Sequence, residues 1–205
     1  MPPEQALDTQ RRILTAAGAL FAQYGYEGVS LSDVLHTACV SRRVLHHHYP
    51  DKAALARAVL SHQHTALVAP DYPVRLQALI TLTHSYASAL RHDPILRGAV
   101  GLSTEPGPYL TQAPYQGPIN SVAALLSEAS VRGELLPGVD PARSARFIVA
   151  SYTGTQLLSQ AATGRDDLHE QISVMWQHLL PALADPGLLP TLHTGPPSEA
   201  GRQAA

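Results

Sequence analysis

The chain has 205 residues, 45% of them hydrophobic, and its 14 lysine and arginine residues nearly balance 16 aspartate and glutamate residues. This composition excludes a broadly disordered chain and a uniformly basic protein that coats nucleic acid, so any DNA binding must come from a local patch. A single cysteine, Cys39, excludes a disulfide framework or a cysteine-based zinc site within one chain. No run approaches the roughly 18 apolar residues of a membrane span, and residues 1–12 lack a signal-peptide pattern, so we expect a cytoplasmic protein with no membrane partner.

Helical patterns follow one another along most of the chain, and no segment alternates in the manner of a β-strand. The first helix carries an apolar stripe that includes Ile13 and Phe21, and Gly25 ends it. Two short helices are predicted over 31–38 and 42–48, followed by a longer one from residue 52. The longer helix is expected to bury Leu55, Val59, Leu60 and Leu67. The remaining predicted helices span 73–92, 94–103, 118–133, 141–164 and 167–184. Pro73, Pro94 and Pro141 suit first helical positions. About nine helices predict an all-α fold.

Residues 31–49 have the spacing of a helix-turn-helix unit. Ser30 and Ser41 fit N-caps of two short helices, and a tight connection over residues 37–40 joins them. In such a unit the second helix enters the major groove, and the side chains at its N-terminus reach the bases. Here that end carries Arg42 and Arg43, whose guanidinium groups can hold a guanine edge or clamp a phosphate.

Other polar side chains near this helix are candidate phosphate contacts. Hydroxyl groups of Ser30 and Ser32 can donate to phosphate, and Lys52 begins the next helix. The imidazole N–H groups of His46 and His47 can also donate hydrogen bonds to a phosphate. The candidate DNA contacts from this pattern are Ser30, Ser32, Ser41, Arg42, Arg43, His46, His47 and Lys52. The alternative is an ordinary helical hairpin with a solvated basic edge.

Residues 9–60 closely resemble the DNA-binding domain of the tetracycline-repressor (TetR) family. The resemblance rests on Leu20-Phe21, Gly25-Tyr26, Ser30, Val40-Ser41, Leu45, His48-Tyr49 and Lys52, which agree in type and spacing over about fifty residues. It implies operator DNA as a partner and adds Tyr49 to the candidate DNA contacts. Three residues depart from the family pattern: Cys39 and Arg43 stand where glycine is usual, and His46 replaces a phosphate-contacting tyrosine. We expect these changes to affect which operator sequence the protein prefers more than whether it binds DNA.

The remainder of the chain resembles the gamma-butyrolactone receptor branch, whose members govern antibiotic production in filamentous soil bacteria. The resembling segments are 93–98, 138–140, 152–155 and 175–176. The resemblance implies a homodimeric repressor without a cofactor, which leaves an inverted-repeat operator when a small hydrophobic signal enters its C-terminal domain. It places two polar ligand contacts on Gln63 and Thr155. In true receptors of this branch a tryptophan lines the pocket, and the matching position in this chain lies near Pro118 and holds no tryptophan. The alternative is therefore a pseudo-receptor, which responds to an antibiotic, an intermediate or another hydrophobic ligand.

Polar residues on the helix predicted over 141–164 indicate a ligand pocket. Tyr152, Thr155 and Gln156 recur at helical spacing, and polar groups inside an alanine- and leucine-rich protein must be paired or face a cavity. A mostly apolar pocket with a few placed donors suits a lactone-like ligand. Further candidate lining residues are Leu82, Tyr86, Tyr115 and Trp176. For Trp176, packing in the core or in a dimer interface is the stronger interpretation.

These patterns divide the chain into three parts. Residues 1–50 form the expected DNA-binding domain, 51–185 the ligand-binding and dimerisation domain, and 186–205 a flexible tail rich in proline and glycine. A second proline-rich stretch, 106–118, is expected to form a long loop between helices.

Other functions find less support in the sequence. Three consecutive histidines at 46–48 point about 100° apart on a helix and cannot converge on one metal ion, so no metal is expected. No phosphate-binding loop, HExxH or GxSxG motif occurs, so we do not expect an enzyme. Cys39 is expected to be a small buried residue rather than a redox sensor. Two alternatives stay open: a helical interaction protein without operator specificity, and a helical enzyme that modifies a small molecule.

Overall fold

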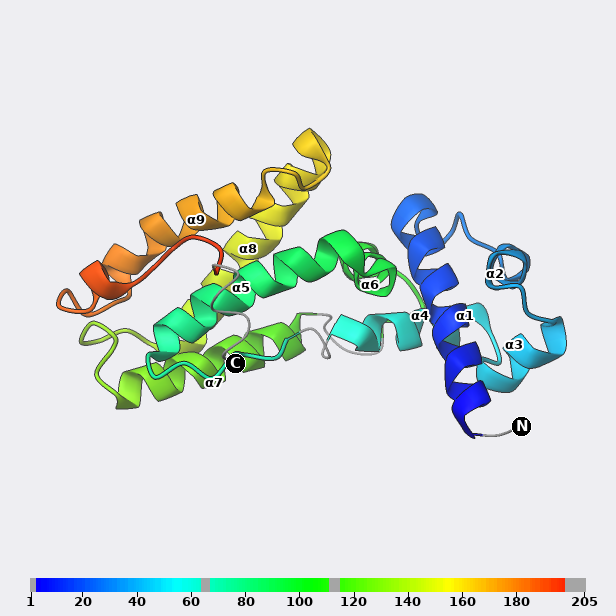
Figure 1. The fold of residues 1–205 in the computed structure, drawn as a ribbon, viewed down its shortest axis with the longest axis horizontal. Coiled ribbons are helices and arrows are strands. Elements are labelled where there is room, and N and C mark those ends of the chain that lie inside the picture. The colour runs from blue at the N-terminus through cyan, green and yellow to red at the C-terminus, as the bar shows by residue number, and fades with distance from the viewer. Residues whose placement is uncertain (1–2, 64–66, 111–114, 198–205) are drawn as a thin grey trace. The chain divides into compact units, whose positions relative to one another are not determined.

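The computed structural model describes residues 3–63, 67–110 and 115–197. Within these ranges the chain forms nine α-helices and two short 3-10 helices (Figure 1), which confirms the predicted all-α class. The α-helices are α1 (Pro3–Tyr24), α2 (Leu31–Ala38), α3 (Arg42–His48), α4 (Lys52–Ser61), α5 (Arg75–His92), α6 (Pro94–Thr104), α7 (Gln116–Val131), α8 (Pro141–Thr163) and α9 (Leu168–Leu179). The 3-10 helices are η2 (Leu180–Ala182) and η3 (Leu189–Thr191). None of the described helices is long and apolar enough to cross a membrane.

Local capping explains where several helices begin. Ser30 and Asp33 form the predicted capping box at α2, and the Ser41 hydroxyl accepts from the Val44 N–H at 3.3 Å at α3. The Asp93 and Asp140 carboxylates cap α6 and α8, and a proline follows each of them at the first helical position.

Several predicted helix boundaries are wrong. The helix predicted over 118–133 is α7, Gln116–Val131, and the helix predicted over 167–184 ends at Leu179. Helix α5 begins at Arg75 rather than at Pro73, because the buried Glu134 carboxylate accepts from the Arg75 and Leu76 N–H groups at 2.9 Å each. This cap lies 59 residues away in sequence. Helix α4 ends at Ser61, so Leu67 lies beyond it and is half-buried.

The chain divides into two compact units. Unit 1 comprises residues 1–66 and 89–114, and unit 2 comprises 67–88 and 115–205. Unit 1 therefore holds α1 to α4 and α6, while unit 2 holds most of α5 together with α7, α8 and α9. The sequence predicts domain boundaries at residues 50 and 185. These boundaries divide the chain by expected function rather than by compactness, and they stay a prediction.

Unit 1 is built around an unusually close contact between α1 and α6. The Gly18 and Gly98 backbones meet, so that a Cβ added to Gly98 would lie 2.5 Å from the Gly18 oxygen. A single apolar core then joins α1 to α2, α3 and α4, and it includes the fully buried Ile13, Leu45 and Leu55. Burial of these side chains fixes the short helices α2 and α3, which are too short to be stable in isolation.

Unit 2 places α8 against α7 and α9 (Figure 1). Trp176 on α9 is fully buried, and its indole N–H donates to the Thr83 hydroxyl of α5 at 2.9 Å. The core interpretation of Trp176 agrees with this burial.

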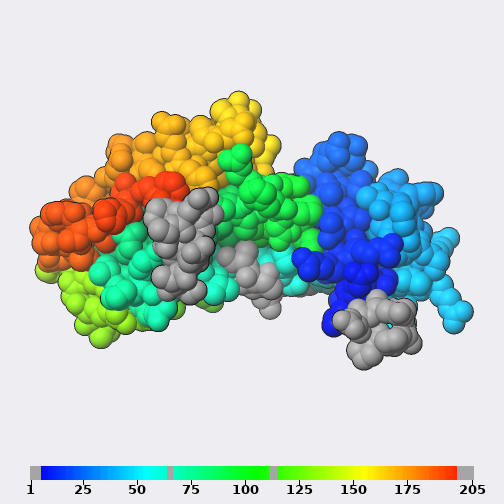
Figure 2. Space-filling view, viewed as in Figure 1, coloured from blue at the N-terminus to red at the C-terminus, as the bar shows by residue number. Residues whose placement is uncertain are grey.

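The segment after α9 differs from the flexible tail expected from residue 186. Residues 186–194 include η3 and lie at the surface of unit 2 (Figure 2). The Gln77 side chain bonds both the N–H and the carbonyl of His193, and the His84 Nε2 lies 2.9 Å from the Thr194 carbonyl oxygen. These partners are more than a hundred residues away in sequence, so local composition could not reveal them. Residues 198–205 of the expected tail lie outside the described residues.

Candidate DNA-binding and ligand-binding sites

Helix α3 presents its two arginines outward from a fixed position. Leu45 is fully buried and Tyr49 is 6% exposed, so the inner face of α3 is anchored in the core of unit 1. Arg42 and Arg43 occupy the first turn and are exposed. In the described part of the chain neither guanidinium is engaged in a hydrogen bond or an ion pair, and the first turn of α3 holds no acidic residue. Both groups are therefore available to an anionic partner.

The turn before α3 is held by backbone bonds and by Arg12. Cys39 adopts the left-handed conformation with φ 50°, and the Val40 N–H returns to the Leu35 carbonyl at 3.2 Å. The Arg12 guanidinium donates to the Ala38 carbonyl at 2.7 Å and to the Cys39 carbonyl at 3.2 Å, which satisfies the C-terminus of α2. The expectation that Cys39 is buried is wrong: it is exposed, because the left-handed turn directs it away from the core.

The other predicted DNA contacts fall into two groups. Ser32, Ser41, His46 and His47 are exposed around the arginines. The Ser30 hydroxyl is occupied in the capping box, where it donates to the Asp33 carboxylate at 2.6 Å.

Lys52 and Tyr49 have structural roles in unit 1. The Lys52 ammonium donates to the Tyr26 and Val29 carbonyls at 2.9 and 3.1 Å and lies 4.1 Å from the centre of the Tyr26 ring. An ammonium has three N–H donors, so at most one is left for a phosphate. Because Tyr49 is buried, we assign its ring to the core rather than to the DNA-facing surface.

A cluster of polar groups in unit 2 forms the candidate ligand site. Tyr152 and Gln156 lie one helical turn apart on α8, and the Tyr152 ring meets the Tyr86 ring of α5 edge-on at 5.8 Å. The Gln156 carbonyl oxygen accepts from the guanidinium of Arg165 at 3.0 and 3.3 Å. Among the described atoms, the Tyr152 hydroxyl and the Gln156 amide nitrogen are buried without a hydrogen-bond partner. Such atoms are costly unless something else satisfies them, which points to a bound ligand.

Electrostatics keep the tyrosines of this cluster neutral. Burial raises the pKa of both Tyr86 and Tyr152, and repulsion from Tyr86 acts in the same direction on Tyr152. The Arg165 guanidinium opposes both shifts without cancelling them. Both side chains therefore keep hydroxyl protons that can be donated to a ligand.

The remaining candidate ligand residues differ in their burial and in their place in the fold. Leu82 is buried on α5, and Thr155 and Tyr115 are half-buried. Tyr115 is close enough to raise the pKa of Tyr86. Gln63 lies in unit 1, where its amide donates to the Ser103 hydroxyl at 2.7 Å, so its predicted ligand contact stays a prediction.

Sequence reasoning missed Arg165. An arginine directly after the helix-ending Gly164 is typical of an exposed loop, yet only 8% of Arg165 is exposed and its φ is 75°. Its guanidinium bonds Gln156, nine residues earlier in the sequence, and no local sequence pattern indicates that contact.

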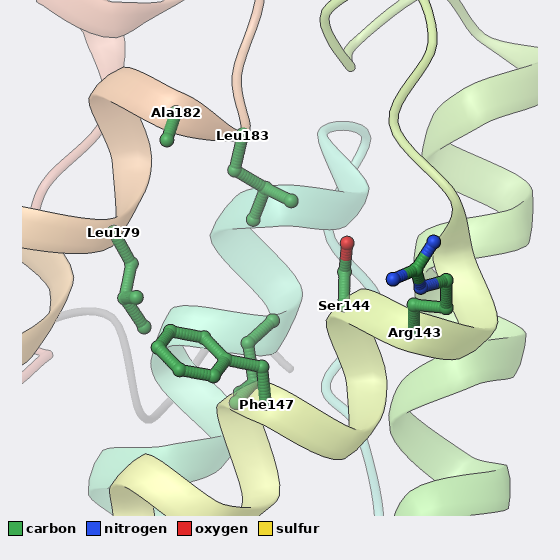
Figure 3. Close-up of a pocket in the computed structure, with 7 residues that line it drawn as sticks. Arg143, Ser144, Phe147, Leu179, Ala182 and Leu183 are labelled. Carbon is green, nitrogen blue, oxygen red and sulfur yellow. The ribbon is translucent and has the colours of Figure 1, made fainter.

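Helices α8 and α9 also leave apolar side chains on the surface. Phe147 and Leu158 of α8 are 61% and 74% exposed, and Val174 of α9 is 40% exposed. Phe147 also lines a shallow hollow of about 260 Å³, where it points toward Leu179 and Arg143 lies at the rim (Figure 3). Exposed apolar patches of this kind are typical of protein interfaces.

The chain is similar to known proteins over most of its length. A family model described as bacterial regulatory proteins, tetR family, matches residues 13–59. The A-factor receptor protein from Streptomyces griseus is 38% identical over 189 residues, which cover 90% of this chain and 67% of that receptor. The structure of TylP, a TetR regulator from Streptomyces fradiae, has a TM-score of 0.85 at 35% identity and covers 98% of this chain and 96% of TylP. A gamma-butyrolactone receptor described as ArpA-like has a TM-score of 0.70 at 25% identity and covers 90% of this chain and 91% of the receptor.

Proposed function

The chain belongs to the TetR family of bacterial regulatory proteins, and from this premise we propose that it is a repressor released from DNA by a small signalling molecule. The family consists of DNA-binding regulators rather than enzymes. We propose that two copies bind an inverted-repeat operator in the cytoplasm and control antibiotic or other secondary-metabolite genes. These finer points follow from the resemblance to the receptor branch.

The exposed arginine pair on a helix whose inner face is anchored in the core is the observation that carries this proposal. Arg42 and Arg43 stand at the N-terminus of α3, where side chains of a helix-turn-helix reach base edges. Burial of Leu45 fixes the orientation of α3, so the arginines are presented in a defined geometry. Exposed Ser32, His46 and His47 can add contacts to the DNA backbone.

The ligand proposal rests on the polar cluster in unit 2. Buried donors on Tyr152 and Gln156, with the buried Leu82 one helical turn before Tyr86 on α5, suit a molecule with a hydrophobic body and an oxygen-bearing head. A gamma-butyrolactone-like signal has this composition, and relatives include proteins named as receptors for A-factor and for gamma-butyrolactone. The replacement of the pocket tryptophan near Pro118 favours a second candidate, a pseudo-receptor for an antibiotic, a biosynthetic intermediate or another hydrophobic ligand.

The exposed apolar face of α8 and α9 supports the dimer. Phe147, Leu158 and Val174 would be buried against the same surface of a second copy, as in a two-fold interface.

Release from DNA requires that the ligand bind two conformations unequally. A ligand shifts the balance between DNA-binding and DNA-free forms only by its difference in affinity for them. We propose that α4 transmits this difference, since Lys52 at its start bonds the turn before α2 and Gln63 beyond its end bonds α6.

A footprinting experiment tests the proposal. The full chain should protect an inverted repeat in the DNA upstream of its own gene, and a screen of butyrolactones, butenolides, furans and co-produced antibiotics should find a compound that removes the protection. Absence of protection would contradict the repressor proposal and favour a helical protein without operator specificity. Turnover of the active compound would instead indicate an enzyme.

A further inference from the structure

The core anchors helix α3 at its middle and at its end, but not at its start. Leu45, in the middle of the helix, and Tyr49, at its C-cap, are buried. Arg42 and Arg43 form the exposed first turn, and Val44 beside them is only half-buried. A helix of seven residues is too short to be stable alone, so the position of its first turn depends on the chain that leads into it.

The chain that leads into α3 is a turn over residues 38–41 with a strained backbone. Cys39, at the C-cap of α2, has φ 50°, a conformation that favours glycine because a Cβ there crowds the following carbonyl oxygen. The Cys39 thiol is exposed, so packing of this side chain does little to hold the turn. A residue persists in such a conformation only where its surroundings fix it, and the turn therefore depends on contacts from outside.

Arg12 of α1 provides such contacts. Its Nη2 atom donates to the Ala38 carbonyl at 2.7 Å and to the Cys39 carbonyl at 3.2 Å. Nη2 carries two N–H groups, so each carbonyl can accept one of them. Ala38 and Cys39 are the last residue and the C-cap of α2, where carbonyl groups lack partners within the helix and a positive charge is favourable. One side chain of α1 thus bonds the backbone of the strained turn itself.

We infer that Arg12 is a positioning residue for operator binding, which holds the left-handed turn at Cys39 and thereby fixes the start of α3. This inference rests on the proposed function, because it concerns the same recognition helix. A helix whose first turn is already in place presents Arg42 and Arg43 to the DNA without having to be ordered on binding, and this raises affinity. Arg12 acts on affinity through α3 and not through a DNA contact of its own.

Hydrogen exchange in the DNA-free, full-length protein tests whether Arg12 holds the turn. The Val40 N–H bonds the Leu35 carbonyl across the turn at 3.2 Å, so its exchange reports on opening of the turn. In Arg12→Met, which removes the guanidinium, the Val40 amide should exchange at least fivefold faster than in the wild type, while the Tyr49 amide changes less than twofold. Arg11→Met removes the exposed arginine next to it and should leave both rates unchanged.

Unchanged exchange of the Val40 amide in folded Arg12→Met would overturn the inference. Thermal melting checks that each variant is folded, and Arg12→Gln takes the place of Arg12→Met in every assay if the latter is not.

Operator affinity tests the consequence for DNA binding. In fluorescence anisotropy, Arg12→Met should bind the operator at least fivefold more weakly than Arg11→Met, which loses the same charge one residue earlier. The slope of log affinity against log salt should be the same in Arg12→Met and in the wild type, because no phosphate contact is lost. A slope shallower by about 0.9 would show that Arg12 itself neutralises a phosphate, and it would overturn the positioning role.

Two substitutions that restore the turn separate positioning from a general structural role. Glycine accepts the left-handed conformation without help, so adding Cys39→Gly to Arg12→Met should recover at least half of the lost log affinity. In the wild-type background Cys39→Gly should change affinity less than twofold. Arg12→Lys keeps a donor for the two carbonyls and should bind within threefold of the wild type. Failure of both Cys39→Gly and Arg12→Lys to restore binding would contradict the inference.

Failure of the proposed function would give a different result. Hydrogen exchange needs no DNA, so absence of operator protection in a footprint would count against the repressor while the Val40 amide still reports on the turn. Faster exchange in Arg12→Met with unchanged operator affinity would overturn only the positioning role of Arg12.

Discussion

Cys39 occupies a position where the backbone favours glycine. Its φ of 50° lies in the left-handed region, at the C-cap of α2 in the turn of the helix-turn-helix unit. A residue with a side chain costs about 1–2 kcal/mol there, because Cβ approaches the following carbonyl oxygen. The thiol is exposed and makes only a long contact, 3.6 Å, to the His36 carbonyl oxygen, so little packing offsets this cost.

Replacing Cys39 with glycine should therefore stabilise unit 1. We expect Cys39→Gly to raise the free energy of unfolding by roughly 0.5–1 kcal/mol, since the added flexibility of the unfolded chain cancels part of the gain. Urea denaturation measures the change. Cys39→Ala keeps the Cβ and should give no such gain; equal effects of the two variants would show that the left-handed backbone is not the cause.

The arginines at the start of α3 should act in DNA binding without affecting folding. Because both are exposed, Arg42→Ala or Arg43→Ala should leave the melting temperature unchanged and weaken operator binding about tenfold or more. Where the arginine neutralises a phosphate, its removal should also make the slope of log affinity against log salt shallower by about 0.9. Fluorescence anisotropy over a salt series separates the two roles, with Arg146→Ala as the control. Unchanged affinity in both variants would remove α3 as the recognition helix.

At the scale of elements, the contact between α1 and α6 depends on two glycines. Added Cβ atoms at Gly18 or Gly98 would lie 2.5 Å from the backbone of the facing helix, a distance that requires the helices to separate. Gly101, also in α6, has only ordinary contacts of 3.8 and 3.9 Å around its Cβ position.

The two glycines of α6 should therefore respond oppositely to alanine. Gly98→Ala should lower the free energy of unfolding by about 1–3 kcal/mol or more through overpacking. Gly101→Ala should raise it by about 0.5–1 kcal/mol, because alanine favours a helix more than glycine does. Chemical denaturation of both variants decides the question, and a stabilising Gly98→Ala would show that the helices are not in close contact.

Helix α5 carries a buried histidine that should make stability depend on pH. His84 is fully buried, with Nδ1 3.0 Å from the His169 Nδ1 and Nε2 2.9 Å from the Thr194 oxygen. Burial lowers the pKa of His84 below its ordinary value. The unfolded chain therefore binds more protons than the folded chain as pH falls below about 6.5.

Stability should accordingly be complete above about pH 6.5 and decrease below it, by at most about 1.4 kcal/mol per pH unit for this one group. His84→Gln, which can still donate to the Thr194 carbonyl, should remove this contribution. Urea titrations between pH 5 and 7.5 measure both slopes. The same slope in the variant would assign the effect to other groups.

Some elements could be predicted from the sequence because local residues specify them. Ser30 and Ser41 cap α2 and α3, and Asp140 and Gly164 bound α8, all within a few residues of the helix ends. The start of α5 and the contacts of residues 193–194 could not be predicted in this way, because their partners lie 58 to 116 residues away in the sequence.

The residues of the candidate sites also divide into those that the local sequence predicts and those that it does not. Arg42 and Arg43 follow from the spacing of a helix-turn-helix. The burial of Arg165 and the internal bonds of Lys52 depend on contacts that exist only after folding.

At the scale of the whole molecule, the proposed operator binding involves two copies of the chain. A dimer presents two recognition helices to successive major grooves, and joining them raises affinity far above that of one unit. The exposed Phe147 and Leu158 of α8 are the side chains that we expect a second copy to cover.

A charge in this apolar face should separate the copies. Phe147→Arg or Leu158→Arg should convert the protein to a monomer and lower operator affinity at least a hundredfold, because the linkage between half-sites is lost. Light scattering after size-exclusion chromatography measures the mass. Val131→Arg, at a position that is 90% exposed on α7, serves as the control. A dimer that persists in both α8 variants would place the interface elsewhere.

A DNase I footprint on the DNA upstream of the gene tests the central proposal most directly. Wild-type protein should protect two symmetric half-sites whose centres are about 10 base pairs, or a multiple of that, apart. The double variant Arg42→Ala/Arg43→Ala should protect neither half-site at the same concentration while remaining folded. No protection by the wild type, or equal protection by the double variant, would contradict the assignment of this chain as an operator-binding repressor that reads DNA through α3.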